Sequence, residues 1–121
     1  MKKLIGFVLA MTVAVGLSAA VVTASVRTAK PVLVTVTMTD FHFKLSKATG
    51  YKHGVAYTFK VVNKGAAPHN FDIQRVKATK ILAPGKSAHF TVTFKKAGSY
   101  QYLCDVPRHA ELGMAGTMKV K

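Results

Sequence analysis

The sequence predicts an all-β fold, an antiparallel β-sandwich of seven to eight short strands that follows an apolar N-terminal segment. Three observations support this. Apolar and polar residues alternate with a period of two in several segments, turn signals separate those segments, and no segment of the main part sustains a helical period. A chain of 121 residues has room for one domain of roughly 100 residues. A large enzyme and a polytopic membrane protein are therefore excluded.

The predicted strands are rich in β-branched and aromatic residues, which suit a half-buried pleated surface. Turns are expected at Thr49-Gly50, Asn63-Lys64-Gly65, Pro84-Gly85-Lys86 and Ala97-Gly98-Ser99. Further short strands are expected at His69–Gln74, Ser99–Leu103 and Ala115–Val120, and Arg75–Leu82 has room for a turn of helix. Four alternating segments have the following residues on one face: Val32, Val34, Val36 and Met38; Phe41, Phe43 and Leu45; Tyr57, Phe59 and Val61; Phe90, Val92 and Phe94.

The N-terminal segment has the pattern of an export signal. Lys2 and Lys3 precede an uncharged stretch that runs to Val26, as in a secretory signal peptide. Small residues permit cleavage after Ala20 or Ala24; the alternative is an uncleaved membrane anchor through residues 4–22, since the stretch is long enough to span a bilayer. We expect a signal or anchor at 1–24, a short linker at 25–31 and one domain at 32–121. The expected location is periplasmic or otherwise extracytoplasmic.

The chain is strongly basic, with 18 Lys and Arg against 4 Asp and Glu and a formal charge of +14. Cleavage of the signal would remove two lysines and no acid. Such an excess is typical of proteins that meet nucleic acid, an anionic membrane surface or an acidic protein partner. Export disfavours nucleic acid, and no basic motif with interleaved aromatic residues supports it. An acidic partner, an anionic membrane surface and a merely soluble basic surface remain open.

Four side chains form the candidate chemical site. The only cysteine lies in a Cys-x4-His-x4-Met run formed by Cys104, His109 and Met114, and Pro68-His69-Asn70 lies upstream at the start of another predicted strand. Thiolate, imidazole and thioether ligands select copper, whereas hard cations prefer oxygen. Two His and one Cys with a weak axial Met are the ligands of an electron-transfer copper centre. We expect a loop between neighbouring strands to supply Cys104, His109 and Met114, with His69 on a strand of the other sheet.

Other interpretations of these residues are weaker. A single Cys cannot form a disulfide within the chain, although it could pair between chains or be buried as a small apolar residue. A structural zinc site would need a fourth strong ligand, and a Cys–His nucleophile, with Asp105 adjacent, would need a substrate cleft. Met118 competes with Met114 by position but falls within the last predicted strand. The remaining histidines are expected at the surface: His42, His53 and His89.

The strand pattern, Asn63-Lys64-Gly65, His69-Asn70 and the Cys104-to-Met114 loop resemble those of the cupredoxins, the small blue type 1 copper proteins of the plastocyanin and azurin superfamily. The ligand loop is most similar to those of rusticyanin and sulfocyanin. The resemblance implies an antiparallel Greek-key sandwich with one type 1 copper ion, held by His69, Cys104 and His109 with Met114 as weak axial ligand. It also implies that Asn70 ties the two ligand loops together, and Pro68 before His69 is plastocyanin-like.

The expected function is one-electron transfer between redox partners by a monomeric protein that is not an enzyme. By the same resemblance, electrons would pass at the exposed edge of His109 within an apolar electron-transfer patch of Ala66, Ala67, Leu112, Gly113 and Ala115, beside Pro68. The partners are expected to be acidic proteins that dock transiently. An alternative that uses the same ligands is copper capture or delivery, although exposed Met-rich or His-rich tracts are absent. An oxidase would need further copper sites, and the chain has 5 His.

Overall fold

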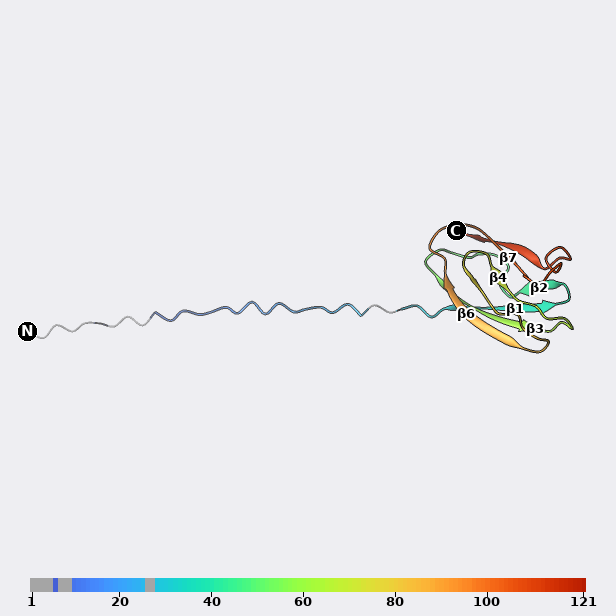
Figure 1. Cartoon of the computed structure of the whole chain (residues 1–121). Helices are drawn as coiled ribbons and strands as arrows, with labels where there is room; N and C mark the ends of the chain where they lie inside the picture. The colour runs from blue at the N-terminus through green and yellow to red at the C-terminus, as the bar shows by residue number, and fades with distance from the viewer. Residues whose placement is uncertain (1–5, 7–9, 26–27) are drawn as a thin grey trace, which may run out of the picture.

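The computed structural model describes residues 6, 10–25 and 28–121. Parts of the predicted signal segment, 1–5 and 7–9, and of the predicted linker, 26–27, lie outside the described residues. Eight strands form two four-stranded sheets, which confirms the all-β sandwich (Figure 1). The strands are β1 (Val32–Thr39), β2 (His42–Leu45), β3 (Ala56–Asn63), β4 (Asp72–Ile73), β5 (Lys77–Ala78), β6 (Ser87–Thr93), β7 (Gly98–Leu103) and β8 (Ala115–Val120).

The first sheet has the strand order β2-β1-β3-β6. Its central pair, β1 and β3, is parallel, with Val36 opposite Val61, so the expectation of purely antiparallel pairing is wrong for this pair. A parallel pair needs a crossover connection instead of a tight hairpin, and here β2 and residues 46–55 supply it. Because β1 and β3 run in the same direction, the residues that follow them, Asp40 and the loop 64–68, lie at the same end of the sheet.

The second sheet has the order β5-β4-β7-β8, and all its pairs are antiparallel. His69 precedes β4, which pairs with β7 through Asp72 and Leu103. The prediction that His69 comes from the sheet opposite the Cys104 loop is therefore wrong. The segment after His69 joins the same sheet as β7 because β4 bonds directly to its edge.

The turn of helix allowed for Arg75–Leu82 is not formed. Arg75 has a positive φ of 62°, and the Val76 amide donates to the Ile73 carbonyl in a tight turn. The chain then returns antiparallel as β5. A residue at positive φ interrupts the right-handed helical conformation, so this segment makes a hairpin instead.

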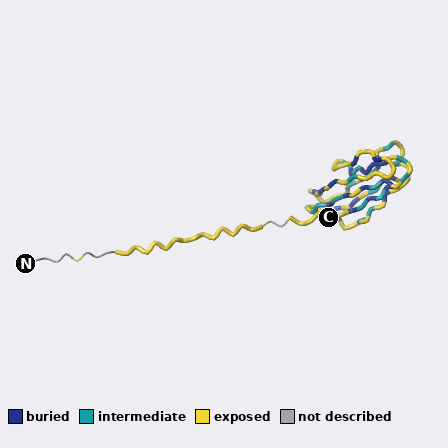
Figure 2. The backbone as a smooth tube through the Cα atoms, turned by 90° about the horizontal axis from the view of Figure 1, so that it is seen from below, coloured by how far each residue is buried: buried dark blue, intermediate teal, exposed yellow. Residues whose placement is uncertain are grey.

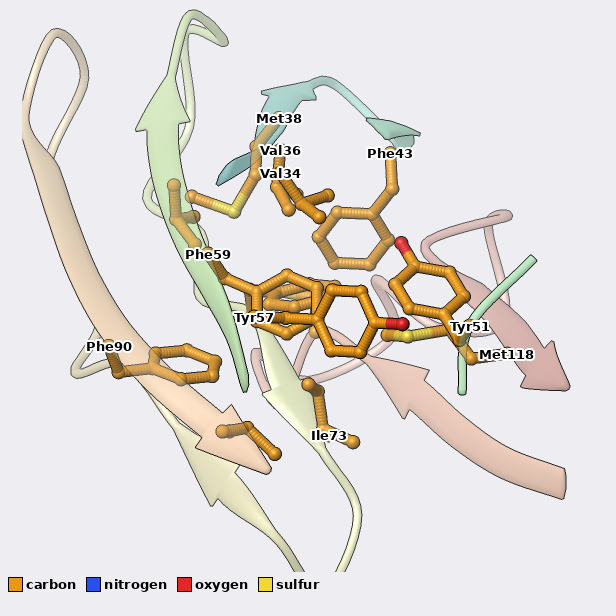
Figure 3. Packing of buried hydrophobic residues seen from close by; sticks show 14 of the residues in the cluster. Val34, Val36, Met38, Phe43, Tyr51, Tyr57, Phe59, Ile73, Phe90 and Met118 are labelled. Atoms are coloured by element: carbon orange, nitrogen blue, oxygen red, sulfur yellow. The ribbon is translucent and has the colours of Figure 1, made fainter. Parts of the chain in front are cut away.

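The core lies between the two sheets and consists of the apolar faces of the strands. Val34, Val36 and Met38 are fully buried, and rings from β6 and the segments between the strands pack tilted or stacked around Phe59 (Figure 3). Met118 lies in this core, opposite Tyr100 of β7. The alternating segments therefore point inward as predicted, with two exceptions. Val32, at the start of β1, is 39% exposed. Phe41 is 36% exposed and lies between β1 and β2 instead of within a strand.

The two ends of the sandwich differ in what they hold. The ligand loop and the loop 64–68 lie at one end. The first strand begins at the other end, where the C-terminal residue is also found, and the N-terminal segment extends from there (Figures 1 and 2). Residues 10–25 are exposed along their whole length. Within the described residues, no helix has the length and hydrophobicity needed to cross a membrane.

Candidate metal centre

Cys104 and Met114 lie at the two ends of the loop that joins β7 to β8. The Cys104 amide donates to the Met114 carbonyl at 3.1 Å, and the Met114 amide donates to the His109 carbonyl at 3.0 Å. Arg108 has a positive φ of 70°, a conformation that non-glycine residues adopt mainly where surrounding contacts hold it. These backbone bonds fold the loop so that Cys104 and His109 face the same point.

His69 is held by backbone bonds to a different segment. Its amide donates to the Leu82 carbonyl at 3.1 Å, and the Leu82 amide donates to the His69 carbonyl at 2.7 Å. The His69 side chain is fully buried. Pro68, immediately before it, is exposed and provides no amide donor. The ring of His69 therefore points into the ligand end of the sandwich and not to solvent.

The structure brings the three strong donors into one triangle. His69 Nδ1 lies 3.0 Å from His109 Nδ1, and Cys104 Sγ lies 3.7 Å from His109 Nδ1 and 4.0 Å from His69 Nδ1. An ion bonded to such donors at about 2.0–2.3 Å spaces them about 3.5–4 Å apart in a plane. Two sides of the triangle match this spacing, and the short third side needs only a small outward movement of one imidazole. Both rings present Nδ1, so their Nε2 atoms point outward.

Three of the four predicted ligands are buried, and His109 alone reaches the surface. Cys104 is 1% exposed and Met114 is fully buried, while His109 is half-buried. The Met114 backbone is bonded to Cys104 and His109, the other two predicted ligands of the loop. Met118 lies in the core opposite Tyr100, three residues before the end of β7 (Figure 3). The position of Met118 favours Met114 as the axial ligand.

Asn70 connects the two segments that carry the donors. Its Nδ2 donates to Asp105 Oδ2 at 2.7 Å, and its Oδ1 accepts the Asp105 amide at 2.7 Å. Asp105 follows Cys104 directly, so this pair of bonds fixes the cysteine relative to His69. The Asp105 carboxylate is thus bonded to Asn70, and no bond joins it to either histidine. Asp105, the acid named in the Cys–His nucleophile interpretation, therefore orients neither histidine.

Asp40 is a functional residue that the sequence did not reveal. Its Oδ1 accepts a hydrogen bond from His69 Nε2 at 2.6 Å, and its two oxygens also accept the Ala66 and Ala67 amides at 3.0 and 3.2 Å. These bonds, the one from His69 first, lower the pKa of Asp40. A carboxylate on the outer nitrogen fixes the tautomer and ring orientation of a metal-ligating histidine.

Gly65 provides the space for this contact. A Cβ at Gly65 would collide with the Asp40 carboxylate and would lie 2.8 Å from His69 Nε2. Asn63 shapes the same loop, since its Oδ1 accepts the Gly65 amide and its Nδ2 donates to the Ala67 and Leu82 carbonyls. The Asn63-Lys64-Gly65 turn therefore brings the loop 64–68 against the outer edge of His69.

His109 lies at the surface among apolar residues. The Phe41 ring packs edge-on against it with a centroid distance of 4.9 Å, and against His69 at 6.1 Å. Burial, followed by the nearby charge of His69, lowers the pKa of His109. Leu112 is 59% exposed. The remaining residues of the predicted electron-transfer patch are exposed, apart from half-buried Ala67: Ala66, Gly113 and Ala115.

His69, Cys104 and His109 form the only cluster of three or more His, Cys, Asp or Glu side chains with metal-binding spacing in the described part of the chain. The other histidines, His42, His53 and His89, are exposed. A family model described as a cupredoxin-like domain matches residues 7–117. The chain belongs to this family. Its His69, Cys104, His109 and Met114 are a donor set typical of type 1 copper, which is the cofactor.

Curated relatives of this cupredoxin-like chain include much longer proteins. The multicopper oxidase mco of Staphylococcus aureus is 32% identical over 77 residues, which are 61% of this chain and 17% of the relative. The copper-resistant cuproprotein CopI of Pseudomonas aeruginosa is 42% identical over 41 residues, which are 34% of this chain and 23% of CopI. The matched segments thus span less than a quarter of these proteins.

Among solved structures, the cupredoxin-like chain is similar to auracyanins. Auracyanin B has a TM-score of 0.63 and 20% identity, covering 78% of this chain and 92% of that one. The dithionite-reduced auracyanin of Roseiflexus castenholzii has a TM-score of 0.59 and 22% identity, covering 77% and 98%. These likenesses establish the shared sandwich fold.

Proposed function

We propose that this protein is an exported carrier of single electrons, with one type 1 copper ion and transient redox partners. The observation that carries the proposal is the triangle of His69, Cys104 and His109 donors, which the backbone and the bonds from Asn70 and Asp40 hold in place. Bound copper supplies the Cu(II)/Cu(I) couple. A donor set held rigidly from two sides moves little between oxidation states, which favours fast transfer.

His109 is the exit point for electrons in this proposal. It is the half-buried member of the donor set, and its ring lies against Phe41 and near the apolar patch of Leu112 and Gly113. Small uncharged residues permit close approach, and a patch of this size suits the weak, short-lived contacts of redox partners. Exposed bases near this end, Lys64, Lys86 and Arg108, would attract an acidic partner and make association depend on salt.

The first experiment tests the copper–thiolate bond. Purified protein titrated with Cu(II) should develop an intense visible thiolate-to-copper absorption band with a one-to-one endpoint. Cys104→Ala should lose the band, while His53→Ala, which changes a surface histidine, should keep it. Absence of the band in the unaltered protein, or its persistence in Cys104→Ala, would contradict the type 1 site.

Copper capture or delivery is the second candidate, and the similarity to a copper-resistant cuproprotein favours it. The two functions differ in what leaves the protein. A carrier should pass through repeated reduction and oxidation with its metal retained in the presence of a Cu(I) chelator. A delivery protein should give up copper to the chelator on reduction, and that result would reject electron transfer as the main role.

A further inference from the structure

The four Asp and Glu side chains all lie at the ligand end. Asp40 accepts a hydrogen bond from His69, and Asp105 follows Cys104. Asp72 lies opposite Leu103 of β7, the neighbouring strand in the sheet. Glu111 lies in the ligand loop itself. Three of the four are occupied by internal hydrogen bonds to His69, Asn70 and Gln74. The negative side chains are therefore concentrated at the ligand end, where most of them accept internal hydrogen bonds.

The opposite end is basic. The His53 amide donates to the Lys121 carbonyl, the Gly54 amide donates to the Phe94 carbonyl, and Gly98 pairs with Val120. These bonds gather the segments 51–56, 93–98 and 119–121, which contain no Asp or Glu side chain. In the described ranges, no Lys or Arg lies within ion-pair distance of a carboxylate. We call this the basic end; its exposed lysines are Lys30, Lys52, Lys95, Lys96, Lys119 and Lys121.

The N-terminal segment joins the domain at this same end. Strand β1 begins at Val32, two residues after Lys30, and Figure 1 shows the N-terminal segment and the C-terminal residue on the same side of the sandwich. The uncharged stretch that precedes Arg27 is long enough to span a bilayer. The ligand end lies a strand length away, about 26 Å for the eight residues of β1.

We propose that the basic end docks on an anionic phospholipid surface and holds the copper site facing away from the membrane. This docking goes beyond the electron-carrier function and does not need the metal. The potential of an anionic membrane decays within a Debye length of about 8 Å at physiological salt. The lysines of the basic end would then lie in that field, together with exposed Arg75, which lies beside Lys95 and Lys96. Each of these charges contributes about fivefold to partitioning. The acids at the far end are outside the reach of the field.

The test uses a chain that begins at Thr28. Both sheets and the whole core come from residues 32–121, and no backbone bond joins residues 10–25 to the sandwich, so this chain keeps the contacts of the domain. Apoprotein is mixed with vesicles of phosphatidylcholine alone, or with vesicles in which about a third of the phosphatidylcholine is replaced by anionic phosphatidylglycerol. Binding is measured by sedimentation, and we expect it on the anionic vesicles only and weakened by salt.

A charge-matched pair of variants locates the surface. The triple change Lys52→Gln, Lys95→Gln, Lys96→Gln removes three charges from the basic end and should lower the partition coefficient about 100-fold. The triple change Lys44→Gln, Lys60→Gln, Lys86→Gln removes three charges elsewhere and should lower it less than about twofold. Equal losses in both triples, or no binding of the unaltered chain, as expected if the partner were an acidic protein, would overturn the proposal.

The absence of tryptophan allows a test of orientation. A single reporter is introduced as Val32→Trp at the basic end or as Leu112→Trp at the ligand end, both at exposed positions. Brominated lipids in the anionic vesicles should quench the emission of Val32→Trp and leave that of Leu112→Trp unchanged. Quenching of the Leu112→Trp reporter instead would show that the ligand end faces the membrane and would reject the proposed orientation.

Discussion

Asp40 Oδ1 accepts a hydrogen bond from His69 Nε2 at 2.6 Å, on the side of the ring away from Cys104 and His109. The parallel pairing of β1 with β3 produces this contact, since Met38 lies opposite Asn63 and the two chains leave the sheet side by side. Asp40 also accepts two amides of the loop 64–68. One carboxylate thus orients a predicted ligand and fastens the loop beside it.

Removal of this carboxylate should weaken copper binding. We expect Asp40→Ala to lower copper affinity by about 10–100-fold, because outer-shell partners of ligating histidines have effects of this size. Asp40→Asn retains an acceptor oxygen and should have a smaller effect. Affinity is measured by competition with a chelator. Glu111→Gln removes the same charge from the ligand loop, so an equal loss in that variant would attribute the effect to surface charge alone.

Replacement of the predicted axial ligand should change the reduction potential and not the metal content. Met114→Leu removes the thioether, and we expect the protein to keep one copper while its potential rises, as measured by redox titration. Met118→Leu is the matched control, because Met118 lies in the core (Figure 3). It should leave the potential unchanged and alter the free energy of unfolding by less than about 1.5 kcal/mol. Loss of copper in Met114→Leu would refute the axial assignment.

A methyl group at Gly65 should disturb the Asp40–His69 contact. The added Cβ would meet the Asp40 carboxylate and the edge of His69, and we expect Gly65→Ala to lower the free energy of unfolding of the apoprotein by about 1–3 kcal/mol. The cost should fall in an Asp40→Ala background, where the carboxylate is gone. Chemical denaturation of the four proteins of this cycle gives the coupling; strictly additive effects would place the clash elsewhere.

Asp72 should give the stability a specific dependence on pH. Burial, followed by the hydrogen bond and charge of Asp105, raises the pKa of Asp72 above its ordinary value of 3.8. Protonated Asp72 therefore stabilises the folded state at pH values below its pKa in the unfolded chain. This stabilisation is lost as the pH rises through its pKa in the folded protein. At pH 7 the ionised carboxylate is unfavourable, so Asp72→Asn should raise Tm of the apoprotein by a few degrees.

The same variant should differ little from the unaltered protein near pH 3, where Asp72 is protonated. Thermal unfolding followed by circular dichroism at both pH values checks this. Asp72→Ala serves as comparison, because it removes the oxygen that accepts from Gln74 as well as the charge. A lower Tm for Asp72→Asn at pH 7 would mean that the hydrogen bond outweighs the repulsion from Asp105.

The period-two pattern predicted most of the strands because burial of one face leaves its mark residue by residue, as at Val34, Val36 and Phe59. Phe41 shares the phase of Phe43 and yet lies beside His109, since local alternation does not reveal where a strand begins. The parallel partner of β1 was also missed. Pairing between distant segments depends on the whole sheet and leaves no local signal.

The all-β class and the donor types could be predicted from the sequence, because strand periodicity and ligand chemistry are properties of neighbouring residues. The spacing of Cys104, His109 and Met114 belongs to one loop and could be read directly. Three further features required the folded structure: the sheet that carries His69, the acid that orients its ring, and the separation of acids and lysines to opposite ends. These relationships join residues far apart in the chain, and packing of the two sheets alone brings them together.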